Sequence, residues 1–167
     1  HRDSFVYSGA PWDLTVALDL RRQQVKQLVE PRQINLKHSH GGIVTLEYAI
    51  QYLQVMHGHR HPSLRTPNTL RALAALIDVG LIPRATGETL RKSYLFIRML
   101  IDGLRMVRGN TKDLVLPPPD SDEFIFLARR VGYQTEDWQA GARHLQTDIE
   151  EHMKQNRQFF EKMFGKV

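Results

Sequence analysis

Apolar residues recur along this chain at intervals of three and four, which is the spacing that places them on one side of an α-helix. The clearest helix is predicted over 86–108, where apolar side chains occupy most of the circumference. Such a helix belongs at the centre of a bundle. The apolar residues that define it are Leu90, Tyr94, Leu95, Ile97, Leu100, Ile101, Leu104 and Val107.

Five further helices follow from the same spacing and from residues that typically begin or end a helix. They are predicted from Pro11 to Pro31, from Ile43 to Gly58, from Thr66-Pro67 to Gly80, from Ser121 to Gly132, and from Thr135 to near residue 164. In the first of these we expect Leu14, Leu18, Val25, Leu28 and Val29 to be buried, and Asp13, Asp19, Arg21, Arg22 and Lys26 to lie in solvent. Other predicted buried residues are Leu70, Leu73, Ala74, Leu76 and Ile77 in the third, and Trp138, Ala142, Leu145, Ile149, Met153 and Phe160 in the last.

The predicted fold class is therefore all-α, an up-and-down bundle of about five to six helices. We expect an irregular N-terminal segment over residues 1–10 and a single helical domain over 11–167. The stretch 114–120 contains three consecutive prolines and is predicted to be an extended connector. Because the first residue is histidine, we expect the chain to be a fragment of a larger multidomain protein.

Composition narrows the class of protein. The 167 residues include no cysteine, so disulfides are excluded, and no apolar run approaches the roughly 18 residues that a membrane span needs. We expect a soluble, cytoplasmic protein without a membrane partner. The net charge of +5 comes from residues 1–109, whereas the rest leans acidic. A basic surface could face phosphates or an acidic partner domain, or simply solvent, and no motif favours nucleic acid as the partner.

The stretch 35–48 departs most from ordinary helical composition, because Lys37, Gly41, Gly42 and Glu47 lie close together there. The two glycines precede a predicted helix, so their N–H groups would lie at the positive end of its dipole, near Lys37. This arrangement can bind a phosphate, with Glu47 orienting Lys37 or an arginine. The alternative is a tight turn that requires glycine, flanked by a solvated lysine.

Arg98 is a further candidate for contacting a phosphate. Arg91, Arg98 and Arg105 recur at heptad spacing on one side of the 86–108 helix, with Asp102 placed to pair with Arg98 or Arg105. The row is either a ridge that faces phosphates or a solvated stripe with ordinary ion pairs, and the second interpretation is the simpler one.

Other chemistry is poorly supported by the residue spacing. His38, His40, His57, His59 and His61 alternate in predicted loops, a spacing that rarely converges on a metal ion, so no metal ligands are predicted. Asp120 and Asp122 flank Ser121, which is better explained as a helix cap than as part of a magnesium site. The chain also has no phosphate-binding P-loop and no nucleophile elbow, so no catalytic residue is predicted.

Four blocks of sequence carry a resemblance to a known family. They are Asn35-Leu36-Lys37, Gly41-Gly42-Ile43, Leu46-Glu47-Tyr48 and Gln51-Tyr52-Leu53-Gln54. Together they resemble the Lys-x-x-x-Gly-Gly-Ile-x-Asp-Ile-Glu-Phe-x-x-Gln-Tyr-Leu segment of glutamine synthetase adenylyltransferases, which is related to the corresponding region of PII uridylyltransferases. The likeness continues through 64–73, 94–98 and 126–133, and so covers residues 15 to 135.

The resemblance implies a non-catalytic helical domain that packs on an upstream nucleotidyltransferase domain and helps to form the cleft for nucleotide or protein substrate. ATP and Mg²⁺ would then be cofactors of the parent protein and not of this chain alone. Glutamine synthetase or a PII-type signalling protein would be partners. Two features depart from the family pattern, because Thr45 replaces its aspartate and its first loop glycine has no counterpart among residues 38–40.

Two other functions compete with this interpretation. A self-contained regulatory or protein-interaction bundle would bind a partner but not ATP and magnesium. A metal-dependent enzyme that uses the histidines would contain a stoichiometric ion.

Overall fold

The computed structural model describes residues 6–9, 13–109 and 114–165. These residues form six α-helices and one 3-10 helix and contain no strand, which confirms the all-α fold class. The elements are α2 (Leu14–Leu28), α3 (Ile43–His57), η1 (Pro62–Leu64), α4 (Thr69–Asp78), α5 (Arg84–Arg108), α6 (Asp122–Arg130) and α7 (Trp138–Phe164). Within the described part of the chain, none of the helices combines the length and apolar character needed to cross a bilayer.

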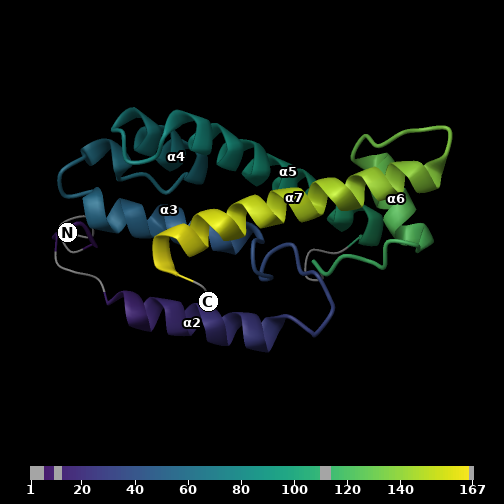
Figure 1. Ribbon diagram of the computed structural model, residues 1–167, viewed down its shortest axis with the longest axis horizontal. Coiled ribbons are helices and arrows are strands. Elements are labelled where there is room, and N and C mark those ends of the chain that lie inside the picture. Colours follow the sequence, from purple (N-terminus) through teal and green to yellow (C-terminus); the bar gives the residue numbers. More distant parts are fainter. Residues whose placement is uncertain (1–5, 10–12, 110–113, 166–167) are drawn as a thin grey trace.

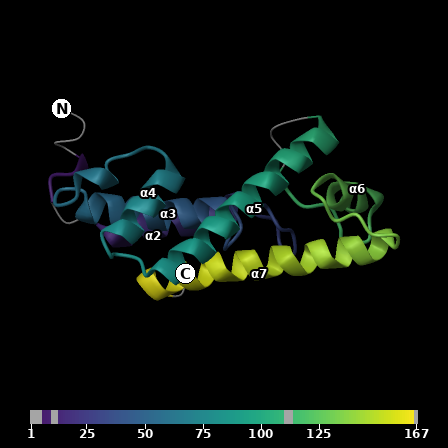
Figure 2. The same cartoon turned by 90° about the horizontal axis from the view of Figure 1, so that it is seen from above.

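The two longest helices, α5 and α7, form the frame of the molecule. They meet at one end and diverge toward the other, where α6 lies between them (Figure 2). Helix α3 packs against α7, α5 and α4, whereas α2 lies to one side of the other helices (Figure 1). The predicted limits of an irregular segment over 1–10 and a domain over 11–167 stay a prediction, because residues 1–5 and 10–12 are outside the described ranges.

The buried apolar side chains form two clusters. One lies between α5, α6 and α7 and includes Leu36 and the first turn of α3. The other lies between α3, α4 and the first half of α5. Tyr94 on α5 packs against both clusters, so α3 and α5 are the helices that join the two halves of the core.

Two helices begin later than predicted, each after a polar side chain that caps it. Helix α3 has the predicted bounds, and Ser121 caps α6 as predicted by accepting a hydrogen bond from the Phe124 N–H at 3.2 Å. Helix α4 instead begins after Asn68, whose side chain accepts from the Arg71 N–H at 3.0 Å. Helix α7 begins after Asp137, which accepts from the Gln139 N–H at 2.9 Å. Asn and Asp caps therefore outweigh the threonines on which the prediction relied.

Three residues of α4, α5 and α7 that were predicted to be buried are exposed. Trp138 opens α7 beyond the bundle, where its ring, 54% exposed, lies 4.5 Å from the Arg129 guanidinium. Leu95 is on the outer face of α5 and 41% exposed. On α4 the buried stripe runs through Ala72 and leaves Ala74 in solvent. Apolar periodicity identified these helices correctly but assigned too wide a buried face to each.

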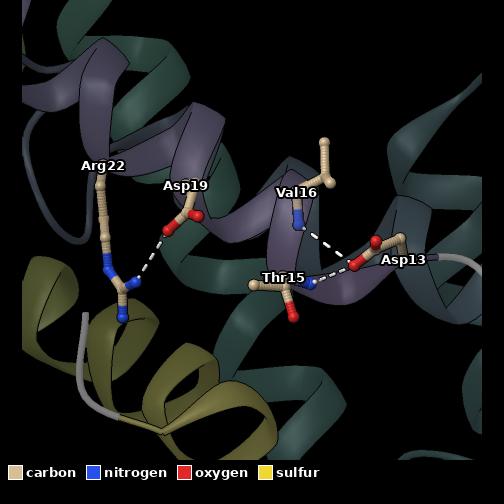
Figure 3. A network of polar contacts seen from close by, with 5 residues as sticks. All are labelled: Asp13, Thr15, Val16, Asp19 and Arg22. Carbon is tan, nitrogen blue, oxygen red and sulfur yellow. Dashed lines mark hydrogen bonds and ion pairs between the residues drawn. The ribbon is translucent and has the colours of Figure 1, made fainter.

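Helix α2 differs most from its prediction. Its N-terminus is capped by Asp13, and Asp19 pairs with Arg22 at 3.0 Å on the exposed side (Figure 3). Leu28, predicted to be buried, is 48% exposed, whereas Arg21, predicted to be in solvent, is 1% exposed. Helix α2 is therefore attached through a buried arginine and not through a continuous apolar face.

Gly41, just before α3, has less room for a side chain than any other described glycine. Its φ is +89°, and a Cβ atom built there would lie 2.1 Å from the Met153 carbonyl oxygen on α7. The Gly41 carbonyl in turn accepts a hydrogen bond from the buried Asn156 side chain at 3.0 Å. Only glycine fits this position, because both the backbone conformation and the space exclude a side chain.

We predict that Gly41→Ala lowers the free energy of unfolding by more than about 4 kcal/mol, because α7 must move away from the start of α3. Gly80→Ala is the matched control, since Gly80 also has a positive φ but no atom lies within 4 Å of a Cβ built there. Gly80→Ala should lower the free energy of unfolding by only about 1 to 2 kcal/mol. Urea denaturation of both variants measures the difference, and equal losses would show that the contact with α7 is unimportant.

Candidate functional site

Hydrogen bonds and packing against the core hold the loop of residues 35–42. The Asn35 side chain accepts hydrogen bonds from the N–H groups of Lys37 and His38 at 2.9 and 3.0 Å. Leu36 is buried in the core, and its N–H donates to the Leu114 carbonyl of the extended connector at 2.9 Å. The loop therefore holds the Lys37 backbone in place while the Lys37 side chain stays exposed.

The N–H groups of the two predicted phosphate-binding glycines already have acceptors within the protein. Gly41 donates to Thr45 Oγ1 at 3.1 Å, and Gly42 donates to the Ser39 carbonyl at 2.8 Å. A Cβ at Gly42 would lie 2.8 Å from the Leu36 carbonyl oxygen. Both glycines thus permit close packing of the loop. Phosphate binding by Gly41 and Gly42 stays a prediction, and it would require these hydrogen bonds to open.

Arg21 attaches α2 to this loop. Its Nη2 donates to the carbonyls of His38 and Ser39, at 2.9 and 3.3 Å, and to Thr45 Oγ1 at 3.0 Å. Its Nη1 donates to Gln24 Oε1 at 3.2 Å. Burial lowers the pKa of Arg21 because the charged guanidinium is desolvated. All four acceptors are uncharged, so the charge is stabilised by dipoles alone.

A second group of polar residues surrounds Glu47 on α3, and we call it the Glu47 cluster: Lys37, Glu47, Tyr94 and Arg98. The Tyr94 hydroxyl donates to Glu47 Oε1 at 3.4 Å. Burial raises the pKa of Glu47, and the Tyr94 hydrogen bond and the charges of Arg98 and Lys37 partly oppose that rise. Three predicted site residues from three separate segments, Lys37, Glu47 and Arg98, thus lie near enough for the two positive charges to act on the carboxylate, although neither cation forms an ion pair with it.

The sequence prediction missed the role of Tyr94, which its spacing assigned to the core. It also left two partners open for Asp102, and the structure selects Arg105, at 3.4 Å. Arg98 and Arg91 make no ion pair among the described residues, so the row of arginines on α5 is not uniformly neutralised. Arg98 is the member of that row whose charge reaches Glu47.

The Glu47 cluster can attract an anion, because it contains two cationic side chains and only one carboxylate, which is half-buried. Charged donors of this kind form the stronger hydrogen bonds to phosphate or carboxylate oxygens. Within the described ranges, no three side chains of the metal-ligating types His, Cys, Asp and Glu come together in a group that could hold a metal ion. The arrangement therefore suits binding and orientation of an anionic group.

Comparison with known proteins identifies relatives over most of the chain. The family model described as GlnD PII-uridylyltransferase matches residues 16–164. The bifunctional glutamine synthetase adenylyltransferase/adenylyl-removing enzyme of Mycobacterium tuberculosis is 36% identical over 119 residues, or 70% of this chain and 12% of that enzyme. The enzyme of the same name from Corynebacterium glutamicum is 32% identical over 131 residues, 78% of this chain and 12% of the enzyme. The chain thus spans about an eighth of the length of these relatives.

We predict that Thr45→Val destabilises the domain by about 2 kcal/mol, because Arg21 and the Gly41 N–H both lose an acceptor inside the protein. Valine keeps the shape of threonine, so packing is preserved. Thr45→Ser is the control, since it keeps the hydroxyl and should cost less. Urea denaturation checks both variants, and a Thr45→Val variant as stable as Thr45→Ser would contradict the role of the hydroxyl.

A second prediction concerns the pH dependence of stability. The pKa of Glu47 is raised in the folded chain above its usual value of 4.5. Its contribution to stability is therefore complete below about pH 4.5 and is lost as the pH rises through the folded-state pKa. Glu47→Gln should be more stable than the unchanged chain at pH 7, with a smaller difference at pH 4.

Denaturant titrations at the two pH values test this prediction. Glu88→Gln, an exposed change on α5, should show no comparable dependence on pH. A Glu47→Gln variant that is destabilised at pH 7 would mean that the ion interactions of Glu47 outweigh its burial.

Proposed function

This chain belongs to the GlnD PII-uridylyltransferase family, and we propose that it is a non-catalytic helical domain of a nucleotidyltransferase of the adenylyltransferase type. In this proposal it packs on a neighbouring catalytic domain and forms one wall of the cleft for nucleotide or protein substrate. The relatives named above are far longer than the chain, which leaves room in them for such a neighbour. The transferred group would be a nucleotidyl group, and the acceptor a protein such as glutamine synthetase or a PII-type signalling protein.

The Glu47 cluster is the observation that carries the proposal. The positive charges of Lys37, in the loop, and Arg98, on α5, both act on the Glu47 carboxylate, and Glu47 is half-buried although burial disfavours its charged form. Polar groups that cost stability are typical of functional sites. In the assembled cleft, Lys37 and Arg98 would contact phosphate oxygens or an acidic acceptor, and Glu47 with Tyr94 would keep them in position.

The outer face of α5 supports the packing part of the proposal. Leu95, Met99 and Met106 are exposed there, and Arg98 lies beside them on the same helix. Exposed apolar side chains next to a charged site are typical of a surface that another domain covers. The neighbouring domain would bind Mg²⁺ and the adenine base of ATP. We place the protein in the cytoplasm, where ATP and Mg²⁺ are available.

We expect Lys37→Ala and Arg98→Ala, made in the full-length protein, each to raise the KM for nucleotide or protein acceptor about tenfold, because each removes one charged hydrogen-bond donor. Arg91→Ala is the matched control, since Arg91 is an exposed arginine two helical turns before Arg98. Steady-state kinetics of nucleotidyl transfer measures all three. Unchanged KM and kcat in both cluster variants would exclude the cluster from the cleft and favour the regulatory bundle.

A further inference from the structure

A groove unrelated to the Glu47 cluster runs between α2, the 29–40 segment and α7. It has a volume of about 760 Å³, and apolar side chains including Val25, Val29 and Met153 line it. Basic side chains surround this apolar surface: Lys26, Arg32, Lys154 and Arg157, together with His40. We call it the α2–α7 groove.

The groove carries a net positive charge. Four lysine and arginine side chains line it against two carboxylates, Glu30 and Glu150. Among the described residues Arg32 and Arg157 make no ion pair, and Lys154 has only an exposed contact of 3.8 Å with Glu151. Unpaired cations around an apolar surface favour a ligand that presents both carboxylates and apolar groups.

The α2–α7 groove continues into a second cavity. This cavity, of about 330 Å³, lies between α7 and the proline-rich connector and is lined by Leu116, Pro117 and Phe124. The two share Arg32, Gln33, Ile34 and Glu150, and Ile34 is 36% exposed where they meet. The surface therefore changes along its length from basic to apolar.

The length of this surface matches a short extended peptide. Its wall on α7 runs from Gln146 to Arg157, which corresponds to about 16 Å of helix. An extended peptide rises about 3.3 Å per residue, so about five residues would fill it. A single compact ligand would occupy only part of it.

Arg32 lies at the centre of this surface in an unusual conformation. The Gln33 N–H donates to the Glu30 carbonyl at 3.1 Å, which closes a turn with Pro31 second and Arg32 third. Arg32 has a φ of +67° and, among the described residues, is the only non-glycine residue with a positive φ. This turn position favours glycine or asparagine. An arginine there is unfavourable for the turn, so the backbone is strained at the residue where the groove and the cavity adjoin.

We propose that the α2–α7 groove and the adjoining cavity bind an extended segment of a partner protein, with acidic residues at the α2 end and apolar residues at the proline end. The binding is independent of the nucleotidyltransferase role proposed above. Nucleic acid fits less well, because Phe124 is the only Phe, Tyr or Trp side chain that lines the two cavities, and at 1% exposure it offers no face on which bases could stack.

A random heptapeptide library displayed on phage, selected on the immobilised 167-residue chain, tests the proposal. Enriched peptides should combine Asp or Glu with apolar residues, and fluorescence anisotropy of two labelled examples gives their affinities. Arg32→Gly should weaken binding about threefold and Arg157→Glu about tenfold, since each removes a cation that lines the surface. Arg91→Glu, a charge reversal on α5 outside both cavities, should leave binding unchanged.

Arg32→Gly also separates binding from folding. Glycine suits the positive φ, so the variant should melt at the same temperature as the unchanged chain or higher, while its affinity falls. No enrichment over an empty support, or peptides that bind Arg157→Glu as tightly as the unchanged chain, would overturn the proposal. A single-stranded DNA oligonucleotide that displaces the peptides and binds more tightly would likewise overturn it, in favour of nucleic acid.

Discussion

The contact between Gly41 and the Met153 carbonyl is the constraint on which the rest of the structure depends. It sets how closely the start of α3 approaches α7, and the buried Asn156 side chain holds the same glycine from the α7 side. Because α3 carries Glu47 and the preceding loop carries Lys37, the contact also fixes the position of the Glu47 cluster relative to α5. The glycine therefore acts through packing, and its N–H donates to Thr45 Oγ1 inside the protein.

Arg21 shows how a helix can be attached without a substantial apolar face. Most side chains of α2 are exposed or only partly buried, and one guanidinium reaches the carbonyls of the 35–42 loop and the Thr45 hydroxyl. In the family pattern that the sequence resembles, the position of Thr45 is an aspartate. In this chain the acceptor is the uncharged Thr45 hydroxyl, so Arg21 holds α2 through directional hydrogen bonds and not through an ion pair.

Helices were predictable from the sequence because their buried apolar residues recur at helical spacing. Both ends of α3 were predicted correctly. Burial was less predictable. Leu95 is exposed and Arg21 is buried because of the segments that α5 and α2 pack against, and the spacing of apolar residues does not specify those segments.

Lys37, Glu47 and Arg98 were each predicted as site residues, but their proximity depends on how α5 packs against α3. Tyr94 was missed because an aromatic residue on an apolar stripe gives no sign that its hydroxyl faces a carboxylate. Nothing in the sequence indicated the α2–α7 groove, since its residues come from segments more than 100 positions apart.

The extended connector has a consequence for the order in which the chain can fold. The 35–42 loop is completed by the Leu36 N–H bond to Leu114 and by the Asn156 bond to Gly41, which join residues 78 and 115 positions apart. Contacts of such high sequence separation form slowly, because a long loop must close before they contribute. During synthesis on the ribosome, α3 to α5 can associate first, but the loop cannot reach its final form until α7 has emerged. The loop that carries Lys37 precedes most of the helices in the sequence, yet among the described residues it is one of the last parts to become ordered.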